Sequence, residues 1–235
     1  MKIRYALLLA LLMMSLLTAC TNAPVSTVSS STPDEIPNSN TPISTESVVP
    51  KSNDQLLAEK YVDVSRLAVS DADIKDKYVF DDRTLTLEDS IDNELEHLVY
   101  QSYYDSVSFQ FEDSLDLIGE NESLQGSVQN EADNCRDGLY MSEYNIHKLT
   151  ILTADDLATI SDFSKQDIIK KIDTYGFTEY AIVQADVSWK HNKASLANGP
   201  QIGDGRYMRY YLLATTTNVS EFKIYDVYWE DFIAK

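Results

Sequence analysis

The sequence predicts an α+β fold, because its apolar residues follow two different spacings along the folded region. In the first part they recur every three or four residues, as on one face of a helix. After residue 176 they mostly alternate with polar residues, as in strands with one buried face. Helices followed by consecutive strands are typical of helices packed on one face of an antiparallel sheet.

Charge and composition exclude several classes of function. The 235 residues include 38 Asp and Glu against 19 Lys and Arg, which gives a formal net charge of −19. Nucleic-acid binding is not expected, because phosphate backbones are held by clustered cations. The two cysteines are too few for a disulfide-stapled scaffold. The sequence contains no phosphate-binding glycine loop, so it predicts no nucleotide cofactor, and we expect no other cofactor.

The N-terminus has the pattern of an export signal. Lys2 and Arg4 precede a run from Ala6 to Leu17 that is apolar except for one serine. A membrane span needs about 20 apolar residues, so this shorter run is typical of a signal peptide, which we place at residues 1–19.

The apolar run ends in the tetrapeptide LTAC, residues 17–20, which resembles the lipobox of bacterial lipoproteins. The resemblance implies that the Cys20 thiol receives a diacylglycerol and that a dedicated peptidase cuts before it. Two acyl chains make a stable membrane anchor. The expected partner is therefore the membrane, with the protein on the outer side of the cytoplasmic membrane. An ordinary secretory signal with a chance cysteine is the alternative.

Residues 20–53 are predicted to be a disordered tether that begins at the lipidated cysteine. Of the 33 residues from 21 to 53, 22 are Ser, Thr, Pro or Asn, and five of the six prolines of the chain lie there. Such a segment buries too little apolar surface to offset the entropy of ordering it. The folded domain is therefore expected over residues 54–235.

Two helices are expected at the start of this domain. The first is capped by Asp54 and extends to Ala68. The second begins at a capping box of Thr86 and Asp89 and ends near Tyr104. Its apolar stripe includes Ile91, Leu95, Leu98 and Val99.

The segments around the second helix are less regular. Residues 70–83 are mixed and charged, and are predicted to be a loop. Residues 107–118 fit a short helix or a strand. Residues 119–138 hold three of the seven glycines and many polar residues, and are predicted to be irregular.

A strand over residues 144–152 marks the change of period, and two helices follow it. Their expected capping boxes are Thr153 with Asp156 and Ser164 with Asp167. The second of these helices should end at Gly176, since glycine is common just after a helix C-terminus.

Three consecutive antiparallel strands are expected to close the domain. The clearest covers residues 181–189, and a one-residue slip in its register would drive Asp186 into the core. After a loop at 191–205, the other two cover residues 206–216 and 222–229. The predicted inner face of the first is Ala181, Val183, Ala185, Val187 and Trp189, and its wetter face is Gln184, Asp186 and Ser188. The inner face should pack against either Ile168, Ile169 and Ile172 or Ile91, Leu95 and Leu98.

The order of these elements and the last strand, EFKIYDVYW at residues 221–229, resemble the NTF2-like superfamily. The resemblance covers residues 85–232. It implies a cystatin-like cone, in which a curved sheet wraps round a long helix and leaves a pocket between them. The helix that starts at Asp54 would be an addition to that fold. Some NTF2-like enzymes use an Asp or a Tyr as acid or base, but the resemblance assigns that role to no residue here.

No catalytic group is evident from the motifs. The three histidines are His97, His147 and His191, and they lack metal-ligand spacing. Cys135 lacks the electropositive setting of a reactive thiol. Ser220 and Lys223 fit the S-x-x-K motif but lead into a strand, where residues three apart point to opposite faces. The acidic segments that start at Asp71 and at Asp133 both lack the ligand spacing of a calcium-binding loop.

The aromatic residues are the remaining signal. Tyrosine offers apolar area together with a hydroxyl, so it serves in a core, in a cross-strand pair or in an amphipathic pocket. The candidate pocket or core aromatics are Tyr100, Tyr104, Trp189, Tyr210 and Trp229.

The sequence therefore predicts a membrane-anchored, surface-exposed, non-catalytic binding or accessory module of the cell envelope, with another envelope protein as a candidate partner. One alternative is an NTF2-like cone that binds or converts a small ligand, which predicts a pocket with a desolvated Asp, Glu or His. The other is a component of an envelope secretion or conjugation assembly.

Cys20→Ser should release the protein from the membrane, because the polar tether has no membrane affinity of its own. Fractionation of cells, followed by immunodetection, measures this. Full retention of the variant in the membrane fraction would show instead that the apolar run acts as an uncleaved anchor.

Overall fold

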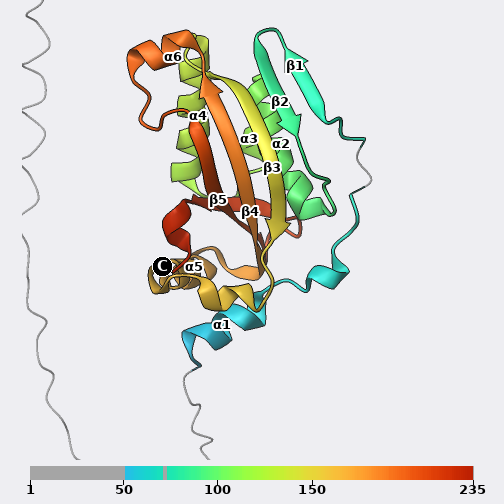
Figure 1. Cartoon of the computed structure of the whole chain (residues 1–235). Coiled ribbons are helices and arrows are strands. Elements are labelled where there is room, and N and C mark those ends of the chain that lie inside the picture. Colours follow the sequence, from blue (N-terminus) through green and yellow to red (C-terminus); the bar gives the residue numbers. More distant parts are fainter. Residues whose placement is uncertain (1–50, 71–72, 235) are drawn as a thin grey trace, which may run out of the picture. The chain divides into compact units, whose positions relative to one another are not determined.

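The computed structural model describes residues 51–70 and 73–234 (Figure 1). The expected signal peptide, Cys20 and nearly all of the expected tether lie outside the described residues. The helices are α1 (Asn53–Lys60), α2 (Glu94–Ser108), α3 (Phe111–Asp116), α4 (Glu122–Arg136), α5 (Asp162–Tyr175) and α6 (Lys193–Asn198). The strands are β1 (Lys77–Phe80), β2 (Arg83–Leu87), β3 (Met141–Ile151), β4 (Phe177–His191), β5 (Gly205–Thr216) and β6 (Lys223–Tyr228). Within these residues, no helix has the length and hydrophobicity needed to span a membrane.

The α+β prediction is confirmed, with a six-stranded sheet whose strands lie side by side in sequence order. The sheet was expected to be antiparallel, but β2 and β3 run parallel while all other neighbours are antiparallel. A parallel pair needs a long crossover. The segment that contains α2, α3 and α4 supplies it.

One face of the sheet is covered by α2, α3 and α4, which lie behind the strands in Figure 1. The predicted inner face of β4 packs into this core together with Leu95 and Val99 of α2, and each of its five residues is at most 3% exposed. Ile91 and Leu98 pack against the same cluster. The second of the two predicted packing partners is therefore correct.

A second apolar core lies on the other face, at the end of the sheet nearest α5 and α1 (Figure 1). Here Ile182 of β4 and Leu212 of β5 are fully buried with Ile168 of α5. The expectation that helices pack on one face only was wrong. The start of β4 has apolar side chains on both faces, including Tyr180, so it needs cover on both sides.

The first helix is shorter than predicted. Ser52, not Asp54, is its N-cap and forms a capping box with Gln55. α1 ends at Lys60 instead of Ala68, because Tyr61 forms a parallel bridge with Tyr180 and donates a hydrogen bond from its hydroxyl to a main-chain carbonyl 2.6 Å away. A tertiary contact thus overrides the helical spacing.

A hairpin of β1 and β2 occupies residues that were predicted to be a loop and the start of a helix. The capping box at Thr86 was wrong, since Arg83–Leu87 is a strand whose alternate residues are buried. α2 begins later, where the Asn93 side chain accepts from two backbone amides, and it continues to Ser108.

Residues 119–138 were wrongly predicted to be irregular, because α4 occupies most of them. The Asn121 side chain caps this helix by accepting from the amides of Ser123 and Leu124. Gly126 lies in the helix with open space around it, while Gly138 takes the left-handed conformation after its end (φ +79°). Only the second glycine therefore marks an end of the helix.

The remaining predictions are mostly correct. The region 107–118 holds the short helix α3, and the expected loop 191–205 contains the unforeseen helix α6. Thr153 and Asp156 form the predicted reciprocal cap. α5 is capped by Ser161, not Ser164, and ends at Gly176 as expected.

Val187→Asp should destabilise the domain by several kcal/mol, because it puts an unpaired carboxylate into the core under α2. Ser188→Asp, on the wetter face of the same strand, should cost about 0.5 kcal/mol or less. Thermal unfolding of both variants tests the register. Equal melting temperatures would contradict it.

Candidate functional site

A cavity of about 250 Å³ lies between the helices α2, α3 and α4 and the sheet. Its walls come from α2, α3, α4 and the strands β3 to β6, so segments distant in sequence meet there. Most of the lining is apolar and includes Leu124, Val128, Ile224 and Val227. Against this background, one basic and one acidic side chain stand out.

The basic residue is Arg209, at the centre of β5. Alternation along the strand turns it to the helix-covered side, together with Tyr207 and Tyr211. Its guanidinium lies 3.8 Å from the centroid of the Trp229 ring, a cation–π contact. Its Nε atom is buried and has no hydrogen-bond partner among the described residues. Arg209 thus retains an unused donor within the cavity wall.

The acidic residue is Glu131 of α4, which accepts a hydrogen bond from the Ser106 hydroxyl of α2. Burial of this carboxyl raises its pKa above the usual value, although the Ser106 hydrogen bond and the positive charge of Arg209 act in the opposite direction. The carboxyl group is therefore biased towards its neutral form.

Three tyrosines, Tyr103, Tyr144 and Tyr211, surround these charges. The Tyr103 ring makes edge contacts with the other two, at centroid distances of 5.5 and 6.0 Å. Burial raises the pKa of all three phenols, so they remain neutral and able to donate. Tyr103 is only 6% exposed, and within the described part of the chain its hydroxyl has no hydrogen-bond partner.

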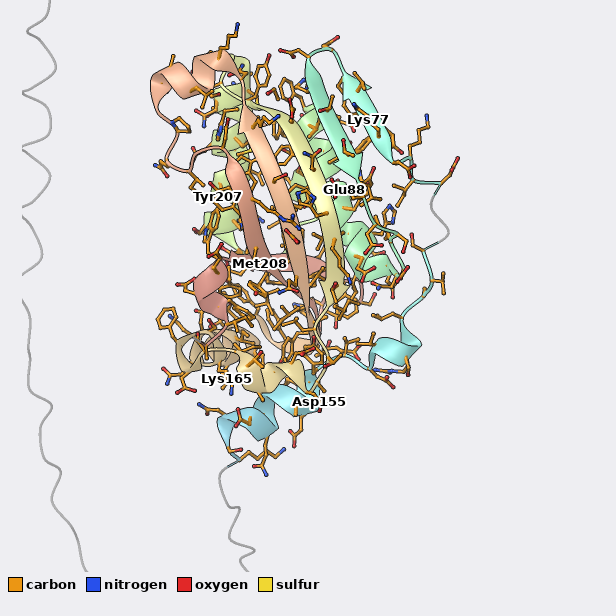
Figure 2. The ribbon with its side chains drawn as sticks, viewed as in Figure 1. Lys77, Glu88, Asp155, Lys165, Tyr207 and Met208 are labelled. Atoms are coloured by element: carbon orange, nitrogen blue, oxygen red, sulfur yellow. The ribbon has the colours of Figure 1, made fainter. Side chains whose placement is uncertain are left out.

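The mouth of the cavity lies at Trp229 and Ile202, which also line a wider surface hollow with Tyr207, Glu230 and Asp231. Trp189 stacks on Tyr207 at a centroid distance of 4.3 Å and closes the wall beneath. Figure 2 places Tyr207 on β5, next to Met208. Ile202 is 38% exposed and lies in the loop before β5.

The five candidate aromatics are divided among three places. Trp189 and Trp229 line the cavity, whereas Tyr100 and Tyr104 lie in the core near β1, where Tyr104 packs against Tyr78. Tyr210 lies in the second core, on the opposite face of the sheet, and its hydroxyl accepts from Gln184. Cys20, the predicted lipidation site, lies outside the described residues.

Sequence reasoning missed the polar groups of the cavity. Glu131 was overlooked because its helix was read as an irregular segment. Arg209 could have been found, since it is the one charged residue in the run from Tyr207 to Thr216 and alternation places it on the inner side of β5. Tyr103 lines the cavity and the adjacent Tyr104 does not, and nothing in the sequence distinguishes the two tyrosines.

Other reactive residues do not join this site. Cys135 lines a separate, more open hollow between α3 and α4. Burial raises the pKa of its thiol to about 12, so it is not a thiolate nucleophile near neutral pH. Over the ranges that the structure covers, no three His, Cys, Asp or Glu side chains are grouped so that they could hold a metal ion.

Comparisons of the chain with protein-family models, with curated proteins and with solved structures find no significant match. The cavity offers one cation, one carboxyl group and neutral phenols inside aromatic walls, an arrangement suited to binding a small ligand.

Glu131→Gln should stabilise the protein at about pH 7.5 but not at about pH 4. The pKa of Glu131 is higher in the folded state than in the unfolded state. Between these two pKa values the folded protein binds more protons, so the free energy of unfolding of the wild type falls as the pH rises through this range. Glutamine has the same shape and no such titration. Urea unfolding at both pH values measures the difference.

Glu122→Gln is the matched control on α4. Its carboxylate lies in the first turn of α4, where a negative charge interacts favourably with the helix dipole. Loss of this charge should slightly destabilise the protein at the higher pH. An equal effect of Glu131→Gln at the two pH values would contradict burial of its carboxyl group.

Proposed function

We propose that the protein is a lipid-anchored binding module of the cell envelope whose domain takes up a small organic anion with an apolar body. The observation that carries this proposal is the unused guanidinium donor of Arg209 inside an aromatic cavity.

The charge of the cavity favours an anion. Arginine is always protonated, and burial disfavours the ionised form of Glu131, so the fixed charge in the cavity is the guanidinium of Arg209. This holds within a chain whose formal net charge is −19. The Nε atom of Arg209 and the Tyr103 hydroxyl are unpaired among the described residues, and a ligand carboxylate at this guanidinium and this hydroxyl would supply charge-assisted hydrogen bonds.

The size of the cavity favours a small ligand. Drug-sized pockets measure roughly 300–1,000 Å³, so 250 Å³ suits a molecule with one ring or a short chain. The rings of Trp189, Trp229 and Tyr144 would contact its apolar part. Such a site would bind its ligand through a complementary shape and one ion pair. Binding of this kind requires no nucleophile in the cavity lining.

We assign the domain to the NTF2-like fold. Support comes from the helices α2, α3 and α4 over one face of the sheet, the pocket between these two layers, and the terminal strands β3 to β6, which pair as a meander. The helix α1 and the cover on the second face are additions to that plan. A pocketed fold of this kind accords with ligand binding rather than with a purely structural role.

The anchor is proposed at Cys20, on the lipobox and the polar tether of residues 20–53. It would hold the domain on the outer side of the cytoplasmic membrane. The cavity would then sample small anions at the cell surface and would bind them without converting them.

Benzoate and phenylacetate should bind the purified protein, and Arg209→Gln should weaken their binding about tenfold or more, because the ion pair to the carboxylate is lost. Isothermal titration calorimetry measures the affinity. Benzyl alcohol, which has a similar shape and no charge, should bind more weakly than either acid to the wild type.

Arg206→Gln is the matched control, since Arg206 lies on the same strand, faces away from the cavity and is paired with Asp186. Its affinity for the two acids should equal that of the wild type. Binding that is unchanged in Arg209→Gln, or equally weakened in Arg206→Gln, would refute the assignment of the cavity.

A further inference from the structure

A second chemical group lies on the open face of the sheet, the face opposite α2, α3 and α4, beyond the end that α5 covers (Figure 2). It consists of Glu88, which follows β2, His147 of β3 and Ser188 of β4. His147 Nδ1 lies 2.7 Å from a carboxylate oxygen of Glu88, and His147 Nε2 lies 2.9 Å from Ser188 Oγ. These two contacts link an acid, an imidazole and a hydroxyl in series.

The backbone has a specific reason for this geometry. Pairing between β3 and β4 shifts between Ile146 and Lys148, so His147 is the extra residue of a β-bulge. A bulge redirects a side chain relative to the regular pleat. Glu88 is held beside it, because its amide donates to the Ile146 carbonyl at 2.9 Å.

Glu88, His147 and Ser188 are linked in the order acid, base and nucleophile, as nucleophilic catalysis by a serine requires. When Nδ1 carries the proton, the imidazole donates to Glu88 and accepts the hydroxyl proton of Ser188, and both distances lie within hydrogen-bond reach. The His147 side chain is 16% exposed and that of Glu88 is 52% exposed. The imidazole is thus sheltered, while the group as a whole stays accessible from solvent.

Donors for a developing negative charge lie on both sides of the serine. Asn145 of β3 and Arg206 of β5 are the direct cross-strand partners of Ser188. Cross-strand side chains on one face are about 5 Å apart at Cβ, so the side chains of Asn145 and Arg206 begin on either side of Ser188. Arg206 is held by Asp186 through its Nε and Nη2 atoms, at 2.7 and 2.6 Å.

We propose that Ser188 is a nucleophile that accepts acyl groups from small esters, with His147 as its base and Glu88 as the residue that positions the imidazole. Ser188 Oγ forms a bond to the ester carbonyl carbon as its proton passes to His147 Nε2. The carbon–alkoxy bond then breaks and the alcohol leaves with that proton. Water, deprotonated by His147, next attacks the acyl-serine and releases the carboxylic acid and free Ser188.

The substrate class follows from the surroundings. Among the described residues, Ser188 lines neither the anion cavity nor the two surface hollows, so the acyl group would lie on the open surface of the sheet. A small ester needs no enclosed pocket, and Asn145 and Arg206 would receive its carbonyl oxygen. This inference is independent of the anion pocket, which lies on the opposite side of the sheet.

The test uses the purified full chain with two probes, a fluorophosphonate and p-nitrophenyl acetate. The fluorophosphonate should form one adduct at Ser188, located by peptide mass spectrometry. Ser188→Ala should abolish this adduct and lower ester hydrolysis at least tenfold, and His147→Gln should do the same while keeping a polar side chain in the bulge. Circular dichroism and melting temperature confirm that each variant folds.

Ser142→Ala is the matched control, because Ser142 is another β3–β4 serine whose hydroxyl donates to a main-chain carbonyl, that of Lys190. It should leave labelling and hydrolysis unchanged. Glu88→Gln should reduce the labelling rate and remove the downfield Nδ1 proton signal of His147 from the NMR spectrum. Absence of a Ser188 adduct, or labelling that persists at the same rate in His147→Gln, would overturn the proposal.

Discussion

The two-sided burial of β4 is the constraint on which the rest of the structure depends. Near its start the strand carries apolar side chains on both faces, and further along only the inner face remains apolar. Burying both faces requires helical cover on both sides, which α2 and α5 provide. Where the outer face becomes polar, the cover ends and the sheet meets solvent.

Both proposed sites follow from this arrangement. On the inner side, the tyrosines and Arg209 fill the space under α2 and α4 incompletely and leave the cavity. On the outer side, the loss of cover exposes a row of polar residues to water, among them His147 and Ser188. One sheet thus presents two unlike chemistries, an aromatic interior with a buried cation and an open surface with a linked acid, imidazole and hydroxyl.

The strands could be predicted from the sequence, whereas much of the helical layer could not. Alternation from Ala181 to Trp189 is a local pattern with one solution, so the register of β4 was predicted correctly. α4 was missed because it is polar, contains Gly126 and buries little beyond Ala132. Glu131 was missed with it, since its place in the cavity depends on how two distant segments meet. The series from Glu88 to Ser188 depends on a bulge, which no periodic pattern reveals.

The parallel pairing of β2 with β3 has a consequence for the order in which the domain assembles. Thr84 pairs with Glu143, so this contact closes a long loop that contains three helices, whereas β3 to β6 are joined to their neighbours by shorter connections. We expect the meander to form early and the docking of the β1–β2 hairpin on β3 to complete the sheet late. Late, peripheral elements open first in the native state, so amide exchange should be fastest at β1 and slowest at β4. Glu88 follows directly from that hairpin, so the acid proposed to position His147 is attached to the part of the sheet that we expect to open first.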